Sequence, residues 1–345
     1  MLADGLRGSP GVTALLSLSR RADVLESPDP PPCDLLVGTY RGVLGFAGRL
    51  LIAPWLVWRL VPRLRALAPD LTVCAHPGPL DLIMGYALRW AGVPFVVIVH
   101  DADAHPGDGL PFLMALQRRL CRLADGVAAL TGHVGDRLGE QGLTGRDGAK
   151  LIRVFMPPLR FGAPPPRPAD GPLRLLFFGR LLPYKGMDLL TEALDVLGPR
   201  PDIVVRVGGS GPESPDLARL RDRPGVTVEN RWVPETELGD LLGWAHALVL
   251  PYREASQSGV AAAGLAAGCA IIATDVGGLR EQLAGLPNVT LCPPDAAAIA
   301  NAMDRMARDR PAATAVDADA AWREMAGLLL RQARALPTRT SPPNT

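Results

Sequence analysis

Short apolar segments alternate with helix-like stretches along the whole chain of 345 residues, and this alternation constrains the fold most. Continuous apolar strands alternating with helices are typical of a parallel sheet that helices cover on both faces. The candidate strands of the first half are VTALLSLS, DLLVGT, LTVCAH, FVVIVHD, GVAALT and KLIRVFM. Those of the second half are LRLLFFG, IVVRVGG, GVTVEN, HALVLP, AIIAT and NVTLC. The sequence therefore predicts an α/β protein with two such sheets.

A proline-rich segment, PPLRFGAPPPRPADGP at residues 157–172, separates the two series of strands. Clusters of proline and glycine are typical of linkers. We therefore expect a Rossmann-like domain over residues 1–160, a linker over 161–172 and a second Rossmann-like domain over 173–315. Residues 316–336 are expected to form a C-terminal helix that could pack back on the first domain.

Sheets of this kind bind their ligands at the carboxyl ends of the strands. With two such domains, the site is expected in a cleft between parallel sheets that face each other. A Rossmann-like domain usually opens with a strand and a glycine-rich turn. This sequence opens with LADGLRGSPG, which is typical of the helix that follows them. The N-terminal domain is therefore expected to be incomplete at its start, with its first strand missing. Either the domain lacks this strand, or the natural start of the chain lies upstream.

Composition argues against several classes of function. The formal net charge of +1 gives no reason to expect a nucleic-acid partner. The five cysteines are widely spaced and form no CxxC pair, which argues against a disulfide framework or a zinc knuckle and is typical of a reducing cytoplasm. The opening residues lack the basic and apolar regions of a signal peptide, so we expect a cytoplasmic protein.

Residues 45–67, GFAGRLLIAPWLVWRLVPRLRAL, are apolar but carry four arginines and two prolines. These charges argue against a membrane-spanning helix. Two alternatives remain. The segment could be an amphipathic helix that packs on a sheet with its arginines in water. It could also lie on the anionic inner face of the cell membrane through Trp55, Trp58 and its leucines, as a peripheral contact.

Two cations follow the first strand of the second half, in FFGRLLPYKGMDLL. The strand is expected to end at Gly179, and Arg180 and Lys185 flank a proline turn that precedes a helix. Cations at the carboxyl end of a strand and near the start of a helix suit a diphosphate. A pair of solvated surface cations without a ligand would give the same pattern.

Two glycine-rich turns follow later strands. In VRVGGSGPES, Gly209 and Gly211 would let the backbone approach a ligand, but Ser214 breaks the GxGxxG dinucleotide fingerprint, which argues against an NAD oxidoreductase. In SQSGVAAAGLAAG, a serine could cap a helix whose first amides, at Gly259 and Val260, would point at a phosphate. Close packing of that helix on the sheet would explain its small residues equally well.

The segment FVVIVHDADAHPGD places His100, Asp101, Asp103 and His105 after another apolar strand. Three interpretations compete. DAD could hold a metal bound to a diphosphate, the whole set could bind a metal directly, or His100 could face a substrate with no metal. We favour the last, because the two cations described above would already neutralise a diphosphate. His76, in VCAHPGP, could also line the cleft.

Together these motifs resemble those of the family 4 glycosyltransferases, which have the two-domain GT-B fold. The resemblance is strongest over residues 173–310, with the G-R-x-x-x-x-K-G signature, the GSGP turn, WVPETEL, LVLPYREASQSGV and IIATDVGGLRE. It extends over residues 71–156, where FVVIVHD and RRLCRLADGVAALT match the pattern of the first domain.

The resemblance implies a metal-independent hexosyltransferase without cofactors. It would transfer a sugar from a nucleotide-sugar donor to a glycan or lipid-linked acceptor with retention of configuration, in polysaccharide or glycoconjugate biosynthesis. Arg180 and Lys185 would neutralise the leaving diphosphate, and His100 would polarise the reacting groups. The donor-binding residues would be Gly179, Gly209, Gly211, Val233, Gln257, Ser258, Gly259 and Val260. The acceptor-side candidates are His76, Asp101 and His105.

The sequence departs from the family pattern at two places. Members commonly carry glutamates at the positions of Ala255 and Ala263, whereas Glu254 lies one residue early. The chain resembles a Q-S-G-V version of the family that lacks these acids, in which Gln257 could contact the sugar. The second departure is the missing first strand. It favours the alternative function, a non-catalytic GT-B homologue that binds a sugar nucleotide or a partner glycosyltransferase.

Overall fold

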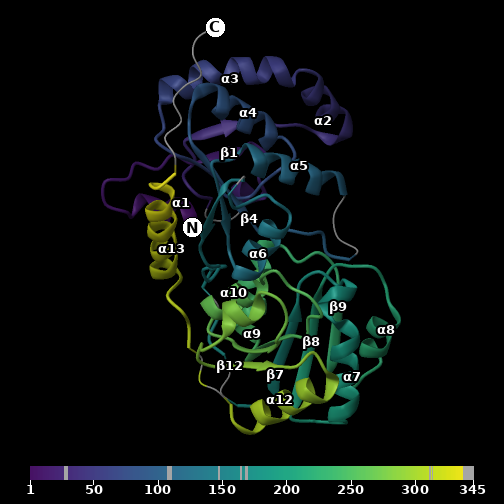
Figure 1. Cartoon of the computed structure of the whole chain (residues 1–345). Coiled ribbons are helices and arrows are strands. Elements are labelled where there is room, and N and C mark those ends of the chain that lie inside the picture. The colour runs from purple at the N-terminus through teal and green to yellow at the C-terminus, as the bar shows by residue number, and fades with distance from the viewer. Residues whose placement is uncertain are drawn as a thin grey trace. The chain divides into compact units, whose positions relative to one another are not determined.

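The computed structural model of the chain divides into two compact units (Figure 1). Unit 1 contains residues 1–104, 109–155 and 322–345, and unit 2 contains residues 105–108 and 156–321. The structure describes residues 1–26, 30–106, 111–146, 148–163, 165–167, 170–310, 312 and 314–336.

Unit 1 is built on a four-stranded parallel sheet in the order β3-β4-β5-β6. The two central strands are buried along their whole length, as their continuous valines and alanines predict. Helices α4, α5 and α6 follow strands β3, β4 and β5 in the chain, which confirms the alternation expected from the sequence. The bounds are β3 Thr72–Cys74, α4 Asp81–Ala91, β4 Phe95–Val99, α5 Pro111–Leu123, β5 Gly126–Ala129, α6 Gly132–Glu140 and β6 Lys150–Arg153.

The first residues form a helix, α1 (Leu2–Arg7), as the opening segment predicts. Two short strands follow, β1 (Ser17–Ser19) and β2 (Leu35–Val37), with the short 3-10 helix η1 (Asp23–Glu26) between them. The two strands pair in parallel as a separate two-stranded sheet and do not join the four-stranded sheet. Both are partly exposed, so they lack the buried apolar faces of central strands.

The segment predicted as one amphipathic helix over residues 45–67 is instead two helices, α2 (Gly42–Leu51) and α3 (Ala53–Leu67), bent by 71°. Pro54 explains the break, because its ring nitrogen cannot donate to the preceding turn. Helix α3 packs on α4 through Val57 and Val61. Among the described residues, no single helix has the length and apolar character to cross a membrane, although α2 and α3 taken as a bent pair reach that threshold.

Unit 2 contains a six-stranded sheet in the order β12-β11-β10-β7-β8-β9, with every pairing parallel. Strands β7 and β10 lie side by side at its centre, and the chain runs outward from them in opposite directions. Ligands of doubly wound sheets bind at the carboxyl ends of the strands at such a reversal of strand order. The bounds are β7 Leu173–Phe178, α7 Met187–Leu197, β8 Ile203–Gly209, α8 Pro215–Arg221, β9 Val226–Asn230, α9 Glu235–Trp244, β10 Ala247–Leu250, α10 Gly259–Ala266, β11 Ala270–Thr274, α11 Leu279–Leu283, β12 Val289–Cys292 and α12 Ala296–Arg308.

Two segments near the predicted domain borders are tied down by specific hydrogen bonds. In the proline-rich linker, Arg167 donates to the backbone oxygens of Ala245 and Ala267, at 2.5 Å in each case, so the linker packs on the rest of unit 2.

At the other predicted border lies the C-terminal helix α13 (Ala318–Ala333). Its Gln332 accepts from the Arg153 amide at 3.1 Å and donates to the Arg153 carbonyl at 2.7 Å, which covers the free edge of β6.

We predict that Gly186→Ala destabilises the protein far more than Gly198→Ala. Both glycines have a positive φ, +73° and +69°, and Gly198, with ψ of −170°, lies in a region that is essentially restricted to glycine, so alanine is strained by about 1 to 3 kcal/mol at either position. A Cβ on Gly186 would also lie 1.8 Å from the Pro251 carbonyl oxygen, whereas one on Gly198 would meet nothing within 4 Å. Denaturant unfolding of both variants measures the difference, and equal losses would show that the loops separate easily.

Candidate functional site

The loops after β7 and β10 meet at the centre of the unit 2 sheet. Gly179 directly follows β7 with φ of +129°, and a Cβ there would lie 3.4 Å from the Val260 side chain at the start of α10. Gly186, after the 3-10 turn η2 (Pro183–Lys185), lies directly against the Pro251 carbonyl after β10. The structure therefore brings the first residue of the G-R-x-x-x-x-K-G signature to the start of α10 and its last residue to the loop after β10.

Aromatic rings support the two cations of this loop. Arg180 Nη2 donates to the Tyr184 hydroxyl at 2.8 Å. Lys185 Nζ lies 3.8 Å from the centroid of the Tyr252 ring and 5.0 Å from that of Tyr184. Tyr252 is fully buried, and burial raises its pKa to about 12, so its ring stays neutral. The two ring faces attract the ammonium group and orient it in the loop.

The start of α10 is fixed by a side-chain cap and by a residue of another helix. Ser258 Oγ accepts from the Ala261 amide at 3.1 Å. Gln282 of α11 accepts from the Ser258 amide at 2.8 Å and donates to the Ser258 carbonyl at 2.9 Å. The Ser258 amide is therefore occupied, which limits the predicted phosphate-binding amides to those of Gly259 and Val260. Those two are the first of the helix, where the helix itself supplies no acceptor.

Three residues in and just before α10 are central to sugar recognition in the family pattern: Ala255, Gln257 and Ala263. The Gln257 Oε1 atom is buried and has no hydrogen-bond partner among the described residues. Ala255 and Ala263, where the family pattern has glutamates, are 2% and 1% exposed and belong to the hydrophobic core of unit 2. Glu254 lies outside that core and contacts His105, with 3.0 Å between Oε1 and Nδ1.

The glycine turn after β8 packs tightly against the loop after β7. A Cβ on Gly209 would lie 1.6 Å from the Gly179 carbonyl oxygen, and one on Gly211 would lie 2.3 Å from that of Leu181. The Gly211 amide donates to Asn230 Oδ1 at 3.1 Å. Both glycines thus have a packing role that explains their identity without a ligand, and donor binding by them stays a prediction.

The segment after β9 presents a large aromatic side chain next to a predicted donor contact. Val233 is partly buried, and Trp232 beside it is 73% exposed. Arg231 donates to Glu237 of α9 at 2.5 Å, which ties this turn to the helix that follows. The backbone around Val233 therefore has a defined position, and its predicted contact with a nucleotide base stays open to test.

In unit 1, His100 and His76 lie together at the carboxyl ends of β4 and β3. Their ring centroids are 5.0 Å apart in an edge-to-face arrangement. His100 Nε2 lies 3.1 Å from the Ala75 carbonyl oxygen, so a proton on that nitrogen satisfies the carbonyl and leaves Nδ1 as an acceptor. Burial lowers the pKa of His100 below its usual 6.5, which favours the neutral ring at neutral pH.

The other members of the HDADAH segment point to different partners. Asp103 accepts from Arg137 and Gln141, each at 2.9 Å. Asp101 offers its backbone carbonyl to Gln117 at 2.7 Å. No group of three or more histidines, cysteines or carboxylates within the described part of the chain could hold a metal ion.

His105 lies with unit 2, although it was predicted on the acceptor side with the first domain. Its ring stacks on Tyr184, with centroids 4.5 Å apart and an interplanar angle of 12°. The loop after β4 thus carries His105 into unit 2. It places the imidazole between Glu254 and the aromatic ring that also receives Arg180.

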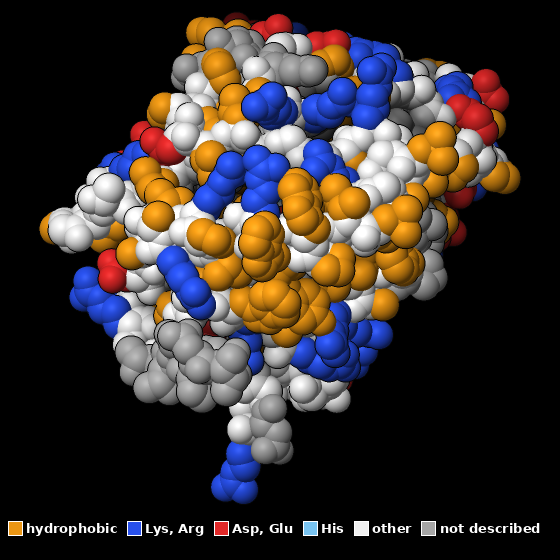
Figure 2. All heavy atoms as spheres, turned by 90° about the horizontal axis from the view of Figure 1, so that it is seen from above, with side chains coloured by type: hydrophobic (Ala, Val, Ile, Leu, Met, Phe, Trp, Pro, Cys, Tyr) orange, Lys and Arg blue, Asp and Glu red, His pale blue; other side chains and the backbone are white. Residues whose placement is uncertain are grey.

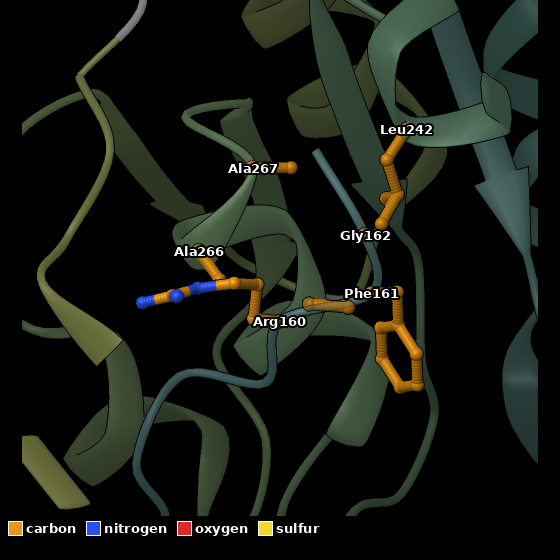
Figure 3. Close-up of a pocket in the computed structure, with 7 residues that line it drawn as sticks. Arg160, Phe161, Gly162, Leu242, Ala266 and Ala267 are labelled. Carbon is orange, nitrogen blue, oxygen red and sulfur yellow. The ribbon is translucent and has the colours of Figure 1, made fainter. Parts of the chain in front are cut away.

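A small pocket lies between the linker and helices α9 and α10 (Figure 3). Its lining residues are Arg160, Phe161, Gly162, Leu242, Ala263, Ala266 and Ala267. Its volume of about 10 Å³ is room for roughly one water molecule. This pocket is therefore too small for a nucleotide sugar. It also shows that the Ala263 methyl faces apolar neighbours such as Phe161 and Leu242.

Sequence reasoning missed four supporting residues: Tyr184, Tyr252, Gln282 and Asn230. Tyr184 and Tyr252 lie inside quoted motifs, and their proximity to the predicted cations was the available signal. Gln282 and Asn230 act on residues 24 and 19 positions away. Only the folded arrangement of the loops brings such pairs together.

We predict that Ala255→Glu and Ala263→Glu each lower the free energy of unfolding by about 3 kcal/mol or more, because each buries a carboxylate in an apolar core. Ala266→Glu, on the partly exposed side of the same helix, is the matched control and should have a small effect. Chemical denaturation measures all three. Near-normal stability with a gain in sugar affinity would mean that the positions can still serve as ligand contacts.

Two parts of the chain match known families. Residues 172–309 match the family described as Glycosyl transferases group 1, and residues 15–150 match Glycosyltransferase Family 4. The glycogen synthase of Mycobacterium tuberculosis is 30% identical over 232 residues, 64% of this chain and 56% of that protein. The D-inositol 3-phosphate glycosyltransferase of Frankia alni is 35% identical over 153 residues, 40% of this chain and 37% of that protein. The chain thus spans about half the length, or less, of these relatives.

Solved structures share the architecture at low sequence identity. Sucrose-phosphate synthase from Thermosynechococcus elongatus is 18% identical, with a TM-score of 0.60, and the match covers 97% of this chain and 87% of that one. Anabaena HepE in complex with UDP and glucose is 18% identical, with a TM-score of 0.61, and coverage is 88% and 86%. The α/β fold predicted from the sequence, with two Rossmann-like halves, is confirmed. Both halves of the chain are thus similar to glycosyltransferases, and its architecture is the GT-B fold.

Proposed function

We propose that the protein is a glycosyltransferase that moves a sugar from a nucleotide-sugar donor to a glycan or lipid-linked acceptor. The proposed reaction is of the hexosyltransferase type, proceeds with retention of configuration and needs neither a metal nor a cofactor. It would serve polysaccharide or glycoconjugate biosynthesis in the cytoplasm, with a possible peripheral contact to the inner face of the cell membrane through residues 45–67.

The observation that carries this proposal is the pair of cations at the carboxyl ends of the central strands of unit 2. Arg180 and Lys185 lie on aromatic rings within a loop packed against the one that precedes α10. A nucleotide diphosphate gains negative charge as the sugar leaves, so prepositioned cations stabilise the transition state more than the bound donor. The amides of Gly259 and Val260 add the partial positive charge of a helix start.

The chain would recognise the sugar without the paired glutamates, as a Q-S-G-V variant of the family. Gln257 supports this, because its buried side-chain oxygen has no partner among the described residues and could accept from a sugar hydroxyl. Relatives named glycogen synthase and D-inositol 3-phosphate glycosyltransferase are sugar-transferring enzymes by name. HepE was solved with UDP and glucose, so UDP-sugars are the first donors to test.

We predict that Arg180→Ala and Lys185→Ala each reduce kcat for sugar transfer by roughly 100- to 1,000-fold, since each removes a cation from the leaving diphosphate. Donor hydrolysis or transfer over a panel of UDP-, GDP- and dTDP-sugars measures the effect. Arg308→Ala, on the exposed surface of α12, is the control and should leave kcat unchanged. Thermal unfolding of all three variants separates loss of function from loss of fold.

The same panel tests the alternative function. Binding of a nucleotide sugar that Arg180→Ala weakens, without transfer to any acceptor, would identify a non-catalytic homologue. The burial of both alanines at the family's glutamate positions is the observation that favours this alternative. If no nucleotide sugar binds at millimolar concentration and neither cation substitution changes anything, the donor-site proposal is wrong.

We also predict an acid limit of activity below pH 6.5 if His100 acts as a neutral polarising group. Its pKa is lowered by burial, so the folded protein resists protonation of the ring. The unfolded chain binds that proton near pH 6.5, whereas the folded protein binds it only at a lower pH. The contribution of His100 to the free energy of unfolding is therefore fully present above pH 6.5 and is lost as the pH falls toward the pKa of the folded state. The pH profile of kcat, compared with that of His100→Gln and with a pH series of unfolding, separates the two effects. An acid limb above pH 6.5 that persists in His100→Gln would belong to another group.

A further inference from the structure

A long stretch of unit 1 contains basic residues and no acidic ones. From residue 35 to residue 69 the sequence has five arginines and neither aspartate nor glutamate. In a chain with 36 basic and 35 acidic residues, this segment is a local excess of positive charge. It contains the two bent helices α2 and α3, so the excess is concentrated on one part of the unit.

The same helices expose large apolar side chains to solvent. No residue of α2 is buried, and Leu44 and Leu51 are 89% and 84% exposed. In α3, Trp58 is 67% exposed, whereas Val57 and Val61 turn inward against α4. The other exposed apolar side chains of this surface are Val43, Leu50, Ile52, Trp55 and Leu67. An exposed apolar surface of this extent marks an interaction site.

The arginines border this apolar surface and are not neutralised there. Figure 2 shows orange and blue side chains gathered on the face that carries α2 and α3. The structure gives Arg41, Arg49, Arg59 and Arg63 no ion pair with any carboxylate that it describes. Arg59 lies over the Trp55 ring, 5.1 Å from its centroid. Such a pairing of guanidinium and indole suits the interface between water and lipid, where both groups are favoured.

We propose that α2 and α3 form a docking surface for an anionic lipid bilayer, on which the two helices lie without crossing it. The apolar side chains would enter the boundary between headgroups and acyl chains, and the arginines would bind lipid phosphates. The absence of acidic residues from 35–69 matches a negatively charged partner. The 71° bend gives two short helices in place of one long apolar rod, and Arg49, Arg59, Arg63 and Arg65 stand among their apolar residues. Both features favour lying at the surface over spanning.

The proposal extends the sequence-based alternative in three respects. It includes the whole of α2, it identifies Leu44 and Leu51 as inserting side chains beside Trp58, and it assigns the arginines to anionic headgroups. It does not depend on the donor chemistry proposed above, because vesicle binding can be measured without any sugar nucleotide.

Co-sedimentation of the full chain with vesicles tests the docking surface. One set of vesicles contains phosphatidylcholine alone and the other contains phosphatidylcholine with phosphatidylglycerol. We expect binding to the anionic vesicles, weak binding to the neutral ones and a marked loss at high salt. Arg59→Gln with Arg63→Gln should lower the partition coefficient by roughly 25-fold, since each basic residue near an anionic surface contributes about fivefold.

A second double variant, Leu44→Ser with Trp58→Ser, removes the apolar part and should lower the partition coefficient by about tenfold or more. Val196→Ser with Arg308→Gln is the matched control, because it removes one exposed apolar and one basic side chain from α7 and α12 of unit 2. The control should bind like the unchanged protein. Thermal unfolding should be unaltered in all variants, since the substituted side chains are exposed.

Three outcomes would overturn the proposal. Equal binding to neutral and anionic vesicles would show that the arginines do not bind anionic headgroups. A dimer in light scattering that Leu44→Ser with Trp58→Ser disrupts, together with no vesicle binding, would mean that a second copy covers this surface. Resistance of the native membrane-bound protein to extraction at alkaline pH would mean that the helix pair is inserted across the bilayer. Failure of sugar transfer, by contrast, would leave the vesicle result unaffected.

Discussion

The architecture of the candidate donor site depends on the close approach of two loop backbones. Gly186, after β7, lies against the Pro251 carbonyl, after β10, at a distance that no Cβ could tolerate. A second approach, of Gly209 to the Gly179 carbonyl, joins the β8 loop to the same place. Because these contacts are between backbones, they fix the positions of the loops independently of most side chains. The signature glycines are therefore required by packing before any ligand is considered.

The electrostatics of the site follow from this packing. Once the loops are joined, Tyr184 and Tyr252 lie beside the two cations, and the buried Tyr252 ring cannot ionise near neutral pH. Aromatic faces attract a cation through the ring quadrupole and orient it. The neutral side chain of Gln282 holds the start of α10 through two hydrogen bonds to the backbone of Ser258. The arrangement keeps positive potential available at the carboxyl ends of the central strands.

Much of the fold and part of the candidate site could be predicted from the sequence, because continuous apolar strands and glycine turns are local signals. The parallel sheets and the cations after β7 are examples. Three features could not be predicted, because they depend on contacts within the folded protein. The break at Ile52 depends on how Pro54 interacts with the preceding turn, and the supporting role of Gln282 depends on a contact 24 residues away. The position of His105 depends on the path of its loop, which places its ring against Tyr184 of unit 2.

The small residues of α10 decide how this chain could recognise a sugar. A Cβ on Gly264 would lie 2.3 Å from the Leu248 side chain, so α10 lies almost in contact with β10. At that distance Ala255 and Ala263 are enclosed in the core, and no carboxylate could be hydrated there. Backbone amides and cations bind a diphosphate whatever sugar it carries. In the proposed reaction, selectivity for the sugar would therefore come from the few polar side chains at the edge of this core. Gln257, whose buried side-chain oxygen has no partner among the described residues, is the first candidate.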